Sequence, residues 1–132
     1  MKKQYILLID DDPDEFEFLL SAASQLPEHF ECSYAVNADA ALSLLGDFTP
    51  DYILMDMNMP LVNGLECTHR LKSIEKISEI PVFIYTTGYN ETLRSKALSI
   101  GASGCVRKPA HSRILKHMLE NLYTNGTPEI TQ

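Results

Sequence analysis

Five short apolar segments recur along the chain and are separated by stretches with helical periodicity. They occupy residues 5–9, 30–36, 52–55, 82–85 and 104–106. The first, third and fourth segments are almost continuously apolar, which is typical of parallel strands buried on both faces. In the second segment apolar and polar residues alternate, which indicates a strand with one solvated face. We therefore expect the second strand at an edge of the sheet.

Each apolar segment is followed by a predicted helix. Asp12 is the expected N-cap of the first helix, with Pro13 at the first helical position and Glu15 completing a capping box. Asn37 and Asn90 precede the second and fourth helices, and the third is expected over residues 64–74. Core-facing positions recur every three or four residues. They are Phe16, Leu19, Leu20 and Ala23, then Ala38, Ala41, Leu42 and Leu45, then Leu93, Ala97 and Ile100, and finally Leu115, Met118, Leu119 and Leu122.

Five consecutive strand–helix units predict an α/β fold with a doubly wound, five-stranded parallel sheet, five helices and right-handed crossovers. Placing the second strand at the edge favours the flavodoxin-like strand order 2-1-3-4-5. A chain of 132 residues suits one hydrophobic core. We expect one domain over residues 1–123 and a short C-terminal tail over residues 124–132.

Composition and charge exclude several classes of function. Hydrophobic residues make up 45% and charged residues 22% of the chain, as in folded globular proteins. The net charge of −7 argues against a nucleic-acid partner. The first apolar segment is shorter than the core of a signal peptide, no segment is long enough to span a membrane, and the three cysteines form no C-x-x-C pair. We expect a soluble cytoplasmic protein with reduced thiols and no membrane partner.

Acidic side chains are concentrated where the first strand ends. Residues 10–15 hold five of them, and such close like charges raise each other's pKa unless a cation lies among them. In open α/β sheets, ligands bind beyond the carboxyl ends of the strands, at the point where the strand order reverses. For the order 2-1-3-4-5 this point lies between the first and third strands. Asp10 and Asp11 should therefore meet Asp56, which ends the third strand.

A hydroxyl and an ammonium group are expected on the same rim, because Thr86 ends the fourth strand and Lys108 follows the fifth. Carboxylates are hard oxygen ligands that suit Mg²⁺, an ion that also binds phosphate oxygens. A lysine, a hydroxyl and Mg²⁺ around one aspartate can neutralise a transferring phosphoryl group. Asp56 is then a candidate nucleophile.

Four sequence blocks carry a family resemblance. "LLIDDDPDE", "DYILMDMNMPLVNG", "IPVFIYTTG" and "GASGCVRKP" resemble the signature blocks of response regulator receiver domains of two-component signalling, of the stand-alone chemotaxis-regulator type. The separations from Asp56 to Thr86 and from Thr86 to Lys108, 30 and 22 residues, also fit that family. The resemblance extends over about residues 3–123.

The resemblance implies a phosphorylation switch. Asp56 would accept a phosphoryl group from the phosphohistidine of a sensor histidine kinase or a phosphotransfer protein. Asp10, Asp11, Asp56 and the backbone carbonyl of Asn58 would hold Mg²⁺. Transfer and hydrolysis would be self-catalysed, so the chain would be a switch and not a turnover enzyme.

Further roles follow from the same resemblance. Lys108 would pair with the Asp56 carboxylate and then with the acyl phosphate, and Thr86 would move to bind a phosphoryl oxygen. Pro60 and Gly64 would shape the loop after Asp56, and a cis peptide bond would join Lys108 to Pro109. The chain departs from the family pattern at Cys105, where an aromatic residue is usual, and at Thr87, where a smaller residue is common. We expect a weakened aromatic switch at Cys105, and slower phosphoryl transfer or hydrolysis because Thr87 narrows access to Asp56.

The charge is divided along the chain. Residues 1–93 contain 16 acidic and 5 basic residues (−11), whereas residues 94–132 contain 2 acidic and 6 basic residues (+4). The basic residues fall on the fourth helix, fifth strand and fifth helix, which in receivers is the usual output or dimerisation face. An acidic downstream partner or a charge-steered homodimer is one interpretation, and ordinary solvated helix charges are the other.

Two other functions fit parts of the pattern. A phosphatase of the haloacid dehalogenase type would use Asp10 and Asp12 as a D-x-D pair, although Asp12 is better explained as a helix N-cap. An unphosphorylated pseudo-receiver would serve only as an interaction module. We interpret Asp14, Glu15 and Glu17 as solvated residues in the first turn of a helix. The four histidines, at positions 29, 69, 111 and 117, are expected on the surface.

Overall fold

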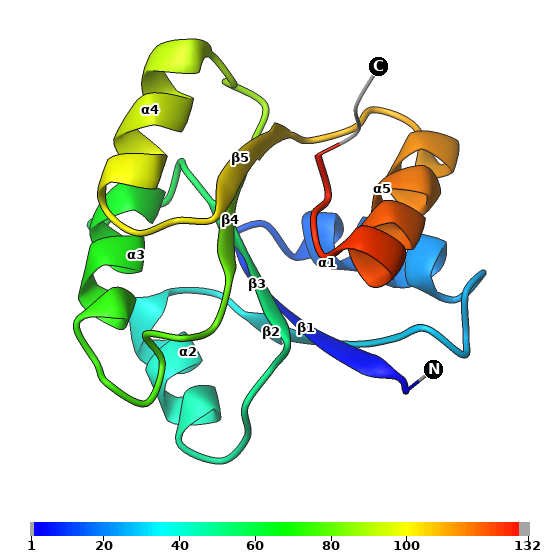
Figure 1. Cartoon of the computed structure of the whole chain (residues 1–132), viewed down its shortest axis with the longest axis horizontal. Helices are drawn as coiled ribbons and strands as arrows, with labels where there is room; N and C mark the ends of the chain where they lie inside the picture. The colour runs from blue at the N-terminus through cyan, green and yellow to red at the C-terminus, as the bar shows by residue number, and fades with distance from the viewer. Residues whose placement is uncertain (1, 130–132) are drawn as a thin grey trace.

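The computed structural model describes residues 2–129, in which five parallel strands alternate with five helices (Figure 1). The strands are β1 (Gln4–Ile9), β2 (Phe30–Ala35), β3 (Tyr52–Asp56), β4 (Val82–Thr86) and β5 (Gly104–Arg107). The helices are α1 (Pro13–Ala23), α2 (Ala38–Leu45), α3 (Gly64–Lys72), α4 (Glu91–Ser99) and α5 (Ser112–Asn125). The strand order is β2-β1-β3-β4-β5, so the predicted fold class and order are confirmed.

Helices cover both faces of the sheet. Helices α1 and α5 lie on one face, and α2, α3 and α4 lie on the other (Figure 1). Successive side chains of a strand point to opposite faces, so one strand supplies both cores. In β1, Ile6 and Leu8 pack beneath α1 and α5, whereas Leu7 and Ile9 pack toward α2 and α3. This explains why β1, β3 and β4 are almost continuously apolar.

Asparagine and aspartate side chains fix where four helices begin. Asp12 accepts a hydrogen bond from the Asp14 N–H, as predicted for the start of α1. Asn37, Asn63 and Asn90 cap α2, α3 and α4 in the same way. Because each helix follows a strand, these caps lie at the rim where the strands end. None of the helices within residues 2–129 is long and apolar enough to cross a membrane.

Several expectations about packing are wrong in detail. Leu20 is 36% exposed, and Ala22 is buried in its place, because the apolar stripe of α1 is rotated toward Ala22 and Ala23. Helix α3 ends at Lys72, two residues early. His29 is only partly exposed, because its ring lies edge-on against the Tyr123 ring with the centroids 4.1 Å apart.

One expectation about the backbone is wrong. No peptide bond within residues 2–129 is cis, so the expected cis bond before Pro109 is wrong. The trans isomer is the more stable form of an X–Pro bond by about 0.5–1 kcal/mol. Helix α5 extends to Asn125, and the following residues fold back beside β5.

Candidate functional site

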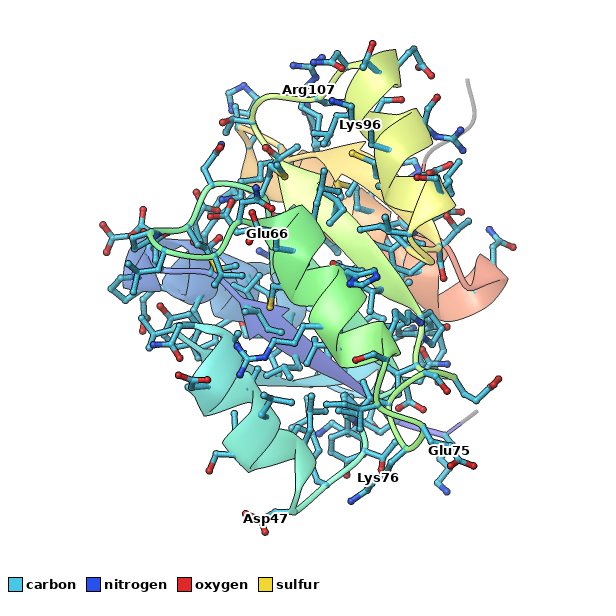
Figure 2. All side chains as sticks on the ribbon, turned by 90° about the vertical axis from the view of Figure 1, so that its left-hand side faces the viewer. Asp47, Glu66, Glu75, Lys76, Lys96 and Arg107 are labelled. Atoms are coloured by element: carbon cyan, nitrogen blue, oxygen red, sulfur yellow. The ribbon has the colours of Figure 1, made fainter. Side chains whose placement is uncertain are left out.

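The carboxyl ends of four strands bring the predicted site residues to one rim of the sheet. Asp10 directly follows β1, and Asp56 is the last residue of β3. The pairing of Ile9 with Met55 places the two aspartates side by side. Thr86 ends β4, and Lys108 follows β5. Figure 2 shows Glu66, in the first turn of α3, toward this end of the molecule, with Asp47, Glu75 and Lys76 at the opposite end.

Three carboxylates converge at this rim. One oxygen from each of Asp10, Asp11 and Asp56 lies within 4.8 Å of the others. Asp10 is 1% exposed and Asp56 4% exposed, whereas Asp11 is open to solvent. Buried carboxylates this close repel one another unless positive charge compensates them. The cluster is therefore open to solvent on one side, and its negative charge requires positive charge nearby.

Lys108 supplies part of the compensating charge. Its Nζ atom lies 2.9 Å from Asp10 Oδ2 and 3.0 Å from Asp56 Oδ1, and its side chain is 9% exposed. The Tyr85 ring lies beneath the ammonium group, with Nζ 5.7 Å from the ring centroid. One lysine thus bridges the two buried carboxylates.

The pKa values of these groups reflect both burial and pairing. Burial raises the pKa of Asp56, the hydrogen bond from Lys108 opposes this rise, and the charge of Asp10 adds to it. For Lys108, burial lowers the pKa, but the hydrogen bonds to Asp10 and Asp56 outweigh burial and leave the pKa raised. Lys108 therefore stays an ammonium at neutral pH. Because the net charge of the cluster remains negative, it favours a further cation.

Thr86 is fully buried beside this cluster. Its hydroxyl oxygen accepts a hydrogen bond from the Gly88 N–H at 3.1 Å, which ties it to the turn before α4. Thr87 is exposed, and its carbonyl accepts a 3.4 Å hydrogen bond from Arg107. The Thr86 hydroxyl is therefore linked to the segment between β4 and α4.

The loop after β3 packs closely on the strand that it leaves. A Cβ atom at Gly64 would overlap the carbonyl oxygen of Asp56, and the Gly64 N–H donates a 2.8 Å hydrogen bond to Met57 O. Only glycine permits this approach. Asn58 is exposed within the loop, and Leu61 has a φ of 72° and a fully exposed side chain.

Comparison with known proteins identifies the family. The family model of the response regulator receiver domain matches residues 6–120. The chain belongs to this family. Receiver domains act as signalling switches in two-component systems, are not enzymes in the usual sense, and interact with histidine kinases and downstream effectors.

Relatives and solved structures agree with this assignment. The phosphate regulon transcriptional regulatory protein PhoB of Pseudomonas aeruginosa is 32% identical over 93% of this receiver and 53% of PhoB. The structure of the phosphorylated cyanobacterial phytochrome response regulator RcpA has a TM-score of 0.80 at 21% identity, covering 95% of this chain and 96% of RcpA.

The receiver domain of the sensor histidine kinase PA1611 of Pseudomonas aeruginosa, with a magnesium ion in its active-site cleft, has a TM-score of 0.73 at 22% identity and covers 90% of this chain and 96% of its own. These structural likenesses show the fold. This receiver spans about half the length, or less, of the curated relatives that it matches.

The sequence did not predict that two further residues, Glu15 and Tyr85, lie at the receiver site. Glu15 is half-buried, with Oε1 3.8 Å from Lys108 Nζ, and burial raises its pKa, so it is not simply solvated. Its position in the first turn of α1, next to the rim, was the one feature of the sequence that could have indicated this contact. Tyr85 carried no signal, because an aromatic residue in a buried strand is ordinary core material.

Asp12 does not join the receiver site. Its side chain caps α1, and its backbone N–H donates a 3.0 Å hydrogen bond to Asp10 Oδ1. A D-x-D phosphatase would need this carboxylate for chemistry, whereas here it satisfies a helix terminus. The geometry therefore disfavours the phosphatase interpretation.

Proposed function

We propose that Asp56 accepts a phosphoryl group from the phosphohistidine of a sensor histidine kinase or a phosphotransfer protein. The observation that carries the proposal is the Lys108 bridge, in which one ammonium group contacts Asp56 at the edge of a three-carboxylate cluster. A structural ion pair needs only one carboxylate. The cluster keeps a net negative charge and is open to solvent at Asp11. It can therefore accept a phosphoryl group together with a divalent cation.

The donor atoms fit Mg²⁺. Carboxylate oxygens are hard ligands, and three of them within 4.8 Å form a suitable partial coordination set. Asp10, Asp11, Asp56 and the carbonyl of Asn58 would hold the ion. When bound, Mg²⁺ would neutralise charge on the phosphoryl oxygens and thereby favour transfer.

The transfer step follows from the position of Asp56. A carboxylate oxygen attacks phosphorus, a P–O bond forms, and the P–N bond breaks with its electron pair returning to the histidine nitrogen. Lys108 moves its hydrogen bond from the carboxylate to a phosphoryl oxygen. In hydrolysis, water attacks phosphorus, the P–O bond to Asp56 breaks, and phosphate leaves with the carboxylate restored. In both steps Asp56 and Lys108 are the side chains in contact with the phosphoryl group, and the three carboxylates at the rim would hold the Mg²⁺ on which transfer depends.

Thr86 is proposed to transmit the change. Its side chain would move so that the hydroxyl donates to a phosphoryl oxygen, and this movement would lengthen the hydrogen bond that the hydroxyl accepts from Gly88. The turn before α4 would then shift, together with the face formed by α4, β5 and α5. A downstream protein, or a second copy of the chain, would recognise this face. We place the receiver in the cytoplasm, where a histidine kinase domain would meet it.

Intact mass spectrometry with Mg²⁺ and acetyl phosphate tests the proposal. Wild type should gain one phosphoryl group, Asp56→Asn should gain none, and chelation of Mg²⁺ should abolish the gain. Asp47→Asn is the matched control, because Asp47 is an exposed acid at the far end of the molecule (Figure 2). An unmodified wild type, or equal modification of Asp56→Asn, would overturn the proposal.

A further inference from the structure

The edge of the sheet at β5 borders a groove that the chain's own tail helps to line. The groove has a volume of about 780 Å³ and lies between the segment before α4 and helix α5. Its lining includes Tyr89, Cys105, Val106, Ile114, Met118 and Pro128. The tail rises between β5 and α5 (Figure 1). Residues 127–129 are thus not a free extension of the domain.

Hydrogen bonds from the Asn121 side chain to the backbone hold the tail in place. The Asn121 Nδ2 group donates to the carbonyl of Thr127 at 3.0 Å and to that of Glu129 at 2.7 Å. Pro128 between them is buried. The tail therefore follows α5 in a defined position that brings the Glu129 side chain over β5.

Three features of the protein surround the Glu129 carboxylate. Its Oε2 atom lies 3.4 Å from Arg94 Nη2, and its Oε1 atom accepts a 3.4 Å hydrogen bond from the Cys105 N–H at the open edge of β5. A Cβ atom at Gly104 would lie 2.5 Å from Oε1. A cation, an edge N–H and an absent side chain together fit a carboxylate.

The bound carboxylate is held loosely. Both contacts are at the long end of the hydrogen-bonding range. The side chains of Arg94 and Glu129 are each 34% exposed, so water competes for both. A ligand with the same chemistry can therefore replace Glu129.

We infer that this groove is a docking site for an extended acidic segment of a partner protein, and that the Glu129 carboxylate of the tail competes with that segment for Arg94 and the Cys105 N–H. The charged residues that line the groove are Glu91, Arg107, Lys108 and Glu129, and Arg94 contacts Glu129. Once Glu129 is displaced, the basic residues outnumber Glu91, and this positive charge attracts such a segment. An unpaired sheet edge accepts extended peptides through its backbone groups. The inference specifies the output partner proposed above, and to that extent it rests on the proposed function.

A labelled synthetic peptide with the sequence of residues 126–132 is the probe, and its version with Glu129→Gln is the control. Both are titrated by fluorescence anisotropy into the full chain, as wild type and as Glu129→Gln, without Mg²⁺ or phosphodonor. The Glu peptide should bind Glu129→Gln about two- to fivefold tighter than wild type, because the competing carboxylate is gone. For the Glu129→Gln protein, the Glu peptide should bind about two- to fivefold tighter than the Gln peptide.

Two further variants separate docking from general charge. Glu120→Gln removes an exposed acid from α5 and should leave peptide binding as in wild type. Adding Gly104→Ala to Glu129→Gln should abolish the difference between the two peptides. The amide signal of Cys105 should shift in Glu129→Gln and return toward its wild-type position when the Glu peptide is added.

Equal binding of the Glu and Gln peptides, no binding to Glu129→Gln, or an unmoved Cys105 amide would overturn the inference. None of these readouts involves Asp56. Failure of the docking site would therefore leave the phosphoacceptor proposal standing, and the reverse also holds.

Discussion

Replacing Lys108 with methionine tests the electrostatic account of the site. Methionine keeps much of the apolar stem but removes the charge that bridges Asp10 and Asp56. At neutral pH without metal, we expect the free energy of unfolding to fall. In Mg²⁺ the loss should be smaller, because the cation would compensate the same carboxylates and would bind the folded state in preference to the unfolded state.

The size of the loss follows from the geometry. At 2.9 and 3.0 Å, with an effective dielectric constant of about 20, each pair contributes about 5–6 kcal/mol of gross attraction. Desolvation of the buried groups offsets most of it, and breaking a buried pair typically costs about 3–5 kcal/mol. The cluster is open to water at Asp11, which places the expected loss at about 2–4 kcal/mol.

Urea unfolding of wild type and variant, with and without Mg²⁺, measures these quantities. Lys96→Met is the matched control, because Lys96 is exposed on α4, and it should change the unfolding free energy by less than about 0.5 kcal/mol. Equal losses in Lys108→Met and Lys96→Met would refute the reasoning. A smaller stabilisation by Mg²⁺ in Lys108→Met than in wild type would also refute it.

Three further predictions concern packing and titration. Gly64→Ala should lower the unfolding free energy by about 1–3 kcal/mol, because the new Cβ overlaps Asp56 O. Gly88→Ala, whose Cβ would meet only the Thr86 hydroxyl at 3.8 Å, should cost less in the same urea assay. Burial makes the pKa of Asp56 higher in the folded state than in the unfolded state. The contribution of this carboxyl group to stability is therefore fully present below the unfolded-state pKa and is lost as the pH rises through the folded-state pKa. The stability of Asp56→Asn relative to wild type, measured without metal, should therefore increase from about pH 4 to about pH 7, and a constant difference would contradict this. Burial raises the pKa of Cys67 to about 11, so its thiol should react with a disulfide reagent much more slowly near neutral pH than after unfolding in guanidinium, whereas similar rates would show an accessible thiolate.

The fold was predictable because several local signals agree. Continuous apolar runs marked the buried strands, and alternation in residues 30–36 correctly placed β2 at the edge. Caps at Asp12, Asn37 and Asn90 located three helix starts. Leu20 was wrongly predicted to face the core, because its helical position fits the apolar stripe of α1 almost as well as the position of Ala22 does. Periodicity fixes the face of a helix only to within about one residue's rotation.

The site was predictable to the extent that topology alone determines it. Asp10, Asp56 and Lys108 converge because the carboxyl ends of parallel strands share one rim. The contact of Glu15 with Lys108 depends on how α1 packs, which no local pattern specifies. The tail contact of Glu129 with Cys105 depends on a reversal after Gly126, whose φ of 77° ends α5. Neither the direction of that turn nor the edge that it reaches could be read from periodicity.

The central claim is tested most directly by locating the phosphoryl group. Wild type is treated with acetyl phosphate and Mg²⁺, and the acyl phosphate is then reduced with borohydride, which converts the modified aspartate to homoserine. Peptide sequencing by mass spectrometry should find homoserine at position 56 and an unchanged aspartate at position 10. Homoserine at position 10, or at neither position, would contradict the account.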